Sequence, residues 1–141
     1  MHSDEESRPV PDVLNPPELA KPRGYAHGVL APSGARVLFV AGQTAADADG
    51  RIAAATFAGQ FAIALERVLT VVRAAGGAAE HIARMNVYVT SMREYRESRA
   101  ALRTVWQRTI GSHYPSMTLV EVTALADEGA AVEIDAMAAV P

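Results

Sequence analysis

Apolar side chains recur at intervals of three and four residues from Phe57 to Ala75, with polar residues between them. This spacing puts the apolar side chains on one side of a helix, so we predict an amphipathic α-helix over this range. Thr56 has the side chain of a helix N-cap residue, and Gly76 and Gly77 are expected to end the helix. The predicted buried stripe consists of Phe61, Leu65, Val68, Leu69 and Val72.

A second helix is predicted from Ser91 to about Ile110. Ser91 and Glu94 have the spacing of a capping box, which satisfies free backbone N–H groups at the start of a helix. Gly111 is expected to end this helix. The side chains expected on its buried side are Tyr95, Leu102, Val105, Trp106 and Thr109.

Short runs that favour β-structure occupy much of the remaining chain. The first two runs are separated by Pro32-Ser33-Gly34, which predicts a β-hairpin. In the last run apolar and polar residues alternate, as expected of a strand with two unlike faces. The predicted strands are Tyr25–Ala31, Arg36–Ala41, Met85–Val89, Met117–Val122 and Val132–Ala138.

The order of these elements, ββαβαββ, predicts an α+β fold with one mixed sheet and two helices on one face. The other face of the sheet is then expected to be solvated or buried against another subunit. Residues 1–23 are rich in proline and in acidic residues and show no apolar periodicity. We expect them to form an extended or disordered arm, followed by a single domain over residues 24–141.

Composition and charge narrow the classes of function. The chain has no cysteine and its four histidines lack the spacing of metal ligands, so we expect no metal and no cofactor. The net charge is −3, and beyond residue 18 acids and bases nearly balance, so nucleic acid is not an expected partner. No apolar run approaches the roughly 20 residues of a membrane span, and the N-terminus lacks the features of a secretory signal. We therefore expect a cytoplasmic protein that does not bind membranes.

Three carboxylates are candidates for chemistry. Glu133 and Asp135 point to the same face of the last predicted strand, and Glu121 is expected on a neighbouring strand beside them. A half-buried glutamate with a raised pKa is a good general base for a water molecule. An ordinary solvated strand face is the more common explanation of such a pattern.

Four further residues are candidates for contacting a ligand. Tyr25 and His27 belong to the first predicted strand and offer a phenol and an imidazole close together. Arg99 and Arg103 are like charges four residues apart on the second helix, an unfavourable pair unless an acid or an anionic ligand lies between them. Histidines and helical arginines are more often structural or solvated residues, and that interpretation stays open.

Five motifs, taken in their order and spacing, resemble the RidA (YjgF) family from about residue 22 to residue 139. The resemblance implies a chorismate-mutase-like fold and a homotrimer, with pockets for small molecules in the clefts between subunits. The motifs are Arg23-Gly24-Tyr25-Ala26-His27-Gly28, Val37-Leu38-Phe39-Val40-Ala41-Gly42-Gln43, Asn86-Val87-Tyr88-Val89, Tyr114-Pro115 and Val132-Glu133-Ile134-Asp135-Ala136.

The best-known activity that this resemblance implies is hydrolysis of reactive enamines and imines, such as 2-aminoacrylate. In that reaction an arginine holds the carboxylate of the substrate, and a glutamate on the last strand holds the attacking water. Glu133 matches the glutamate, but Met117 stands where the arginine is expected, and a thioether does not hold a carboxylate. Ala41 and Arg99 also depart from the family's pattern. The resemblance therefore implies a divergent branch for which 2-aminoacrylate is a poor substrate.

Two functions follow from the resemblance. The first is a deaminase-type hydrolase of a small imine, enamine or related metabolite, with Glu133 as the catalytic residue and Tyr25, His27, Met117 and Arg99 around the substrate. The alternative is a non-catalytic homotrimer that binds a small metabolite in the same cleft. Ribonuclease activity, attributed to some family members, is disfavoured by the near-neutral charge and by the lack of a histidine pair suited to acid–base catalysis.

Overall fold

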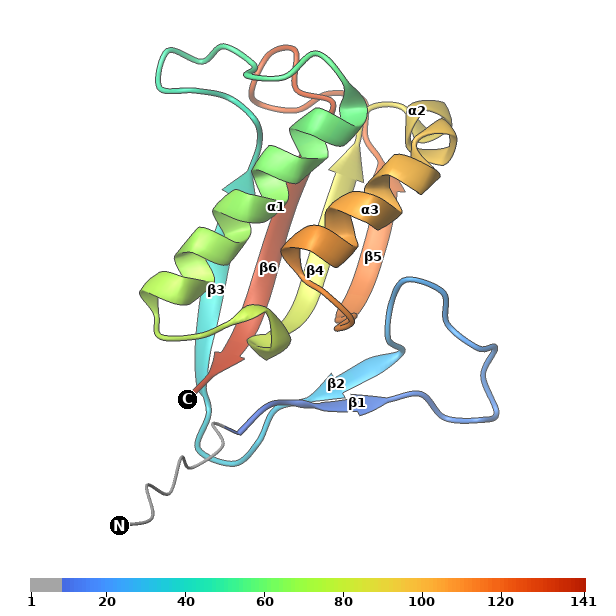
Figure 1. Ribbon diagram of the computed structural model, residues 1–141, viewed down its shortest axis with the longest axis vertical. Coiled ribbons are helices and arrows are strands. Elements are labelled where there is room, and N and C mark those ends of the chain that lie inside the picture. The colour runs from blue at the N-terminus through green and yellow to red at the C-terminus, as the bar shows by residue number, and fades with distance from the viewer. Residues whose placement is uncertain (1–8) are drawn as a thin grey trace.

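A four-stranded mixed sheet forms the centre of the molecule (Figure 1). The computed structural model describes residues 9–141. The strands lie in the order β3 (Arg36–Gln43), β6 (Val132–Val140), β4 (Ile82–Val89) and β5 (Ser116–Glu121). β6 is antiparallel to both of its neighbours, whereas β5 runs parallel to β4. The last of these strands in sequence, β6, thus occupies an interior position of the sheet.

The first helix, α1 (Phe57–Ala74), agrees closely with its prediction. The hydroxyl of Thr56 accepts a hydrogen bond from the backbone N–H of Gly59 at 3.0 Å, which confirms the N-cap. Gly76 has a φ of 83°, the left-handed conformation in which many helices end. The buried side includes the predicted stripe, Phe61, Leu65, Val68, Leu69 and Val72.

The second helical segment is divided at Ser98 into α2 (Met92–Glu97) and α3 (Arg99–Thr109), where one helix was predicted. The Ser91 hydroxyl accepts a hydrogen bond from the N–H of Glu94 at 3.2 Å, so the predicted start is confirmed. Ser98 has φ −94° and ψ 0°, and its N–H is shared between the carbonyl groups of two residues in α2. The backbone leaves regular helical geometry at this residue, and only α3 buries side chains, Leu102 and Trp106.

Both long helices lie on the same face of the sheet, with α1 over β3 and β6 and α3 over β4 and β5 (Figure 1). The core between the layers takes apolar side chains from every one of these elements, and their removal from water is the main source of stability. The expected α+β fold is confirmed, with one mixed sheet and the long helices on one of its faces. Within residues 9–141, no helix has the length and apolar character needed to cross a membrane.

A separate two-stranded sheet lies below one end of the main sheet (Figure 1). It pairs β1 (Asp12–Leu14) with β2 (Gly28–Leu30) in antiparallel register. The predicted hairpin is therefore wrong, because β2 pairs with β1 while β3 pairs with β6. β1 falls within the expected arm of residues 1–23, which thus forms a strand at residues 12–14, and residues 1–8 lie outside the described part of the chain.

A short 3-10 helix, η1 (Ala79–His81), leads from α1 into β4. The side chain of His81 is buried, and its Nδ1 accepts a hydrogen bond from the N–H of Ala78 at 2.8 Å. This histidine therefore holds the turn in place.

Candidate functional site

The face of the sheet turned away from α1 and α3, called the open face below, carries a chain of polar side chains. Asp135 accepts hydrogen bonds from the amide of Asn86 at 2.8 Å and from the hydroxyl of Tyr88 at 3.2 Å. The guanidinium of Arg84 donates to Asn86 at 3.0 Å and to the hydroxyl of Thr118 at 2.6 Å. Asp135 is thus occupied by its neighbours and is a structural carboxylate.

Glu133 lies next to this network without joining it. It is half-buried and stands in register with Tyr88 on β4. Among residues 9–141 its carboxylate has no hydrogen bond or ion pair. On the other side it lies against Gly42, where a Cβ atom would come within 2.8 Å of the glutamate Cδ. Gly42 therefore makes room for the carboxylate, which is left free to bind a water molecule or a ligand.

The phenol of Tyr88, next to this carboxylate, has a pKa above its ordinary value. Burial raises the pKa of the Tyr88 phenol, and the negative charge and hydrogen bond of Asp135 raise it further, with a smaller contribution from Glu133. Arg84 acts in the opposite direction. The phenol consequently stays neutral at physiological pH and keeps its O–H for donation to Asp135.

The third predicted carboxylate, Glu121, does not belong to this face. It is in register with the buried Val89, and its Oε1 accepts a hydrogen bond from the N–H of Met92 at 2.8 Å, at the start of α2. A carboxylate in this position satisfies a free N–H group and favours the helix terminus electrostatically. The predicted cluster of three carboxylates is therefore wrong, and Glu121 is a helix cap.

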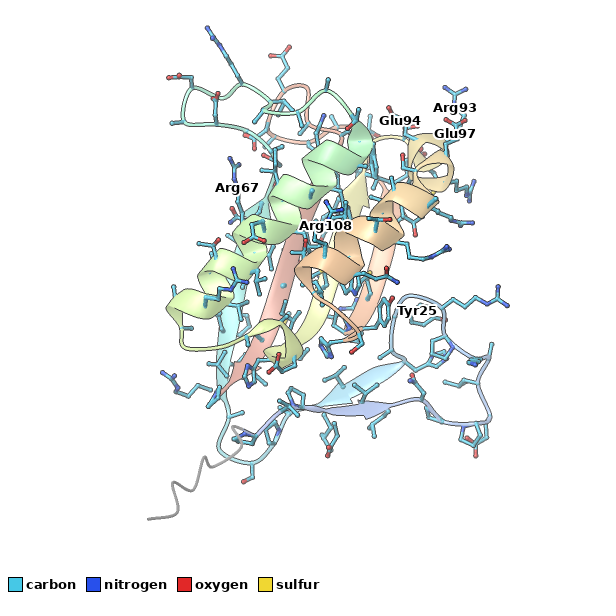
Figure 2. The ribbon with its side chains drawn as sticks, in the orientation of Figure 1. Tyr25, Arg67, Arg93, Glu94, Glu97 and Arg108 are labelled. Atoms are coloured by element: carbon cyan, nitrogen blue, oxygen red, sulfur yellow. The ribbon has the colours of Figure 1, made fainter. Side chains whose placement is uncertain are left out.

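Tyr25 and His27 lie on the segment that precedes β2, where Figure 2 shows Tyr25 near one end of the main sheet. Their rings meet edge to face, with centroids 5.4 Å apart. His27 donates from Nε2 to the carbonyl of Ala20 at 2.6 Å, and its backbone N–H donates to Asn15 Oδ1 at 2.9 Å. The imidazole thus stabilises the conformation of this segment through its hydrogen bond to Ala20. Tyr25 lines a surface pocket of about 700 Å³.

This segment is joined to the start of β5. Ala26 pairs with Ser116, and its N–H donates to the carbonyl of Pro115 at 2.9 Å. Ser116 is in register with Arg84, whereas Glu133 is in register with Tyr88, four residues further along β4. Four residues of strand span about 13 Å, so Tyr25 and Glu133 of one chain lie toward opposite ends of the sheet.

Met117 and Arg99 meet in a pocket of about 450 Å³ beneath α3, called the arginine pocket below. Met117 is in register with the fully buried Met85, so it faces the helices and not the open face. Arg99 lies over the ring of Tyr95, with its Cζ 5.7 Å from the ring centroid. The other residues of the arginine pocket are Arg23, Gly24, Phe61, Val87, Tyr95, Leu102, Arg103, Trp106, Tyr114 and Leu119.

The predicted site residues therefore fall into separate places in one chain. Glu133 faces the open side, whereas Met117 and Arg99 face the helical side. Tyr25 lies beside the arginine pocket, because the adjacent residue Gly24 lines that pocket. Sequence reasoning missed Gly42, although a glycine inside a strand pattern is a signal of close approach. It also missed the contribution of Arg23, whose position depends on a pairing that sequence does not reveal.

Comparison with known proteins shows to which family the chain belongs. Residues 18–140 match the family model of endoribonuclease L-PSP, which covers most of the chain. The chain belongs to this family, the RidA or YjgF family. No protein with a curated description matches it. The predicted family resemblance is confirmed.

Several solved structures of RidA-family proteins are similar to this chain. YyfB, a Rid protein of unknown function from Yersinia pestis, has 27% identity and a TM-score of 0.76, with 92% of this chain and 98% of that one covered. A YjgF-family member from Mycobacterium tuberculosis has 31% identity and a TM-score of 0.60, with 83% and 87% covered. TdcF from E. coli, solved with bound serine, has 26% identity and a TM-score of 0.66, with 87% and 91% covered.

Proposed function

We propose that this RidA-family protein is a deaminase-type hydrolase of a small imine or enamine, with its site in a cleft between two subunits. The observation that carries the proposal is the free carboxylate of Glu133. It is half-buried and unpartnered within residues 9–141, whereas the adjacent Asp135 accepts two hydrogen bonds. A carboxylate in this state can accept a hydrogen bond from water and take its proton. The serine bound by TdcF supports a small amino-acid-like ligand.

The proposed reaction is a hydrolysis and needs no oxidant or reductant. An enamine first takes a proton on carbon and loses one from nitrogen, which gives the imine. Water held by Glu133 adds its oxygen to the imine carbon, while its proton passes to the carboxylate and then to the nitrogen. The carbon–nitrogen bond then breaks with its electron pair on nitrogen, while the new hydroxyl group gives up its proton to nitrogen and becomes the carbonyl. Ammonia leaves, and a carbonyl compound remains.

The proposed cleft requires a second subunit. Glu133 and Met117 lie on opposite faces of one sheet, so a single chain does not present both to one small molecule. The open face also exposes apolar side chains on β3, with Phe39 74% exposed and Val37 60% exposed. Surface of this kind is typical of a protein–protein interface. Burial against further copies would form the homotrimer and bring Glu133 of one subunit toward the arginine pocket of the next.

In this arrangement Tyr25 contacts the substrate and His27 acts as a positioning residue. The imidazole bonds to the carbonyl of Ala20 and supports the ring of Tyr25 edge to face. Met117 contributes apolar surface in the place where the family's deaminases have a carboxylate-binding arginine.

The proposal is tested with imines generated from L-amino acids by an amino acid oxidase, with the loss of imine followed over time. We expect the wild type to accelerate hydrolysis and Glu133→Gln to slow it by about a hundredfold, the usual contribution of a general base. Glu94→Gln is the matched control, because Glu94 is an exposed glutamate on α2 (Figure 2). Equal rates for wild type and Glu133→Gln would overturn the proposed role. If the wild type accelerates the hydrolysis of no imine, the alternative function, a non-catalytic trimer that binds a metabolite, is favoured.

For 2-aminoacrylate we expect slow turnover by the wild type and faster turnover by Met117→Arg, because the guanidinium would hold the substrate's carboxylate. A wild type faster than Met117→Arg would contradict the role given to Met117.

Cleavage of RNA, to which the family's description refers, is less well supported for this chain. The described histidines are each engaged: His27 and His113 bond to backbone carbonyls, and His81 is buried. They do not form a free pair for acid–base chemistry on a ribose hydroxyl.

A further inference from the structure

The arginine pocket combines an apolar floor with a rim of positive charge. Arg23, Arg99 and Arg103 are exposed at the rim, while Phe61, Leu102 and Trp106 are almost completely buried below them. No acidic side chain lines the pocket. Within the described residues none of the three guanidinium groups makes an ion pair or a hydrogen bond.

This charge arrangement favours an anion. Arg99 and Arg103 lie four residues apart on α3, where like charges repel, and Arg23 approaches the same opening from the segment before β2. A carboxylate between the guanidinium groups would remove the repulsion and accept charge-assisted hydrogen bonds.

The apolar floor of the pocket favours a ligand that carries an apolar group next to its anionic group. The Trp106 ring stacks on Tyr114 with centroids 5.5 Å apart, and its indole N–H already donates to the carbonyl of His113 at 3.0 Å. The indole therefore offers a ligand its apolar surface and no free donor. Met117 adds a polarizable thioether, which packs well against aromatic rings. The volume of about 450 Å³ lies in the range of pockets for drug-sized ligands, and a three-carbon acid would leave most of it unfilled.

We infer that the substrate is a carboxylate with an aromatic side chain, such as the imine of an aromatic amino acid. Arg99 and Arg103 bind the carboxylate, and the aromatic ring lies against Trp106 and Met117. The inference rests on the proposed function, because it takes the arginine pocket as the part of the hydrolase's cleft that selects the substrate. It also explains how this chain would hold a carboxylate without an arginine at residue 117.

The test uses the fluorescence of Trp106, the only tryptophan of the chain, which lies in the pocket itself. The wild-type protein is titrated with 3-phenylpropanoate, with propanoate and with the uncharged 3-phenylpropanamide. We expect saturable binding of 3-phenylpropanoate and binding at least about tenfold weaker for each of the others, since each lacks one of the two recognised parts.

Variants of exposed arginines assign the site without disturbing the core. Arg99→Gln and Arg103→Gln should each weaken binding of 3-phenylpropanoate about tenfold. Arg93→Gln is the matched control, because Arg93 projects from α2 well away from Tyr25 (Figure 2) and does not line the pocket. Equal binding of acid and amide, or unchanged binding by Arg99→Gln and Arg103→Gln, would overturn the inference.

Binding and turnover separate the two proposals. If 3-phenylpropanoate binds as expected and no imine is hydrolysed, the hydrolase is overturned and the ligand class stands. If imines are hydrolysed by way of Glu133 but 3-phenylpropanoate does not bind, the ligand class is overturned and the hydrolase stands.

Discussion

Among single residues, Gly42 and Glu133 form the most closely fitted pair at the site. The register of β3 against β6 shifts between Val40 and Gln43, so Gly42 lies at an irregular point of the strand pair. A side chain there would occupy the space that the Glu133 carboxylate now fills. The absence of a side chain at residue 42 therefore sets where the proposed water is held.

We predict that Gly42→Ala lowers imine hydrolysis at least about tenfold, because small displacements of a catalytic group are costly. The new methyl group would lie 2.8 Å from Glu133 Cδ, the far end of a flexible side chain, so the carboxylate should move while the fold persists. The melting temperature should change by only a few degrees. Gly28→Ala is the control, because the nearest atom to its new methyl group is 3.7 Å away, an ordinary contact. Unchanged turnover in Gly42→Ala would argue that the position of Glu133 is not critical.

The sequence was sufficient to place some of these residues and not others. Alternation along residues 132–138 correctly put Glu133 and Asp135 on one face, because a strand has a fixed period of two. The face of Glu121 depends on which strand lies beside it and in which register, and local spacing does not contain that information. For the same reason, the convergence of Arg23 with Arg99 and Arg103 was not predictable.

Among the elements, those with a strong local pattern were predicted and those that depend on a distant partner were not. The bounds of α1 followed from its apolar spacing and caps, whereas β2 took β1 as its partner instead of the adjacent β3. The three residues of β1 are all exposed, so the strand contributes little buried surface. Its role is to hold the segment after it, including Asn15, near the backbone of His27.

We predict that Asn15→Ala weakens substrate binding, seen as a several-fold higher KM, with little change in melting temperature. The substitution removes the acceptor for the His27 N–H at 2.9 Å and so loosens the segment that carries Tyr25. Asn15→Asp keeps an oxygen acceptor and should restore the wild-type KM. An equal effect of both substitutions would show that the hydrogen bond is not what matters.

In the molecule as a whole, the two faces of the sheet have different surroundings. Helices cover one face, and the other combines a polar network on β4 and β6 with exposed apolar residues on β3. The proposed trimer gives this second face its partner.

We predict that the wild type sediments at three times the mass of one chain and that Phe39→Glu shifts it toward monomer at micromolar concentration. Phe39 is 74% exposed on the open face, and a charge there would have to be buried in the interface. Val10→Glu is the control, since Val10 is also exposed but lies outside the main sheet. If the assembly forms from the open face, Phe39→Glu should also lose imine hydrolysis. A monomeric wild type would exclude the intersubunit cleft.

The interior position of β6 also bears on the order in which a new chain can fold. β3 and β4 both take their antiparallel partner from residues 132–140, so during synthesis β3 stays unpaired, and β4 can pair only with β5, until those residues have left the ribosome. Contacts between segments so far apart in sequence slow folding and leave apolar strands exposed in the meantime. α1 can form early from its own sequence, but its buried stripe has no sheet to cover until then. The nascent chain is therefore most prone to aggregate just before β6 emerges.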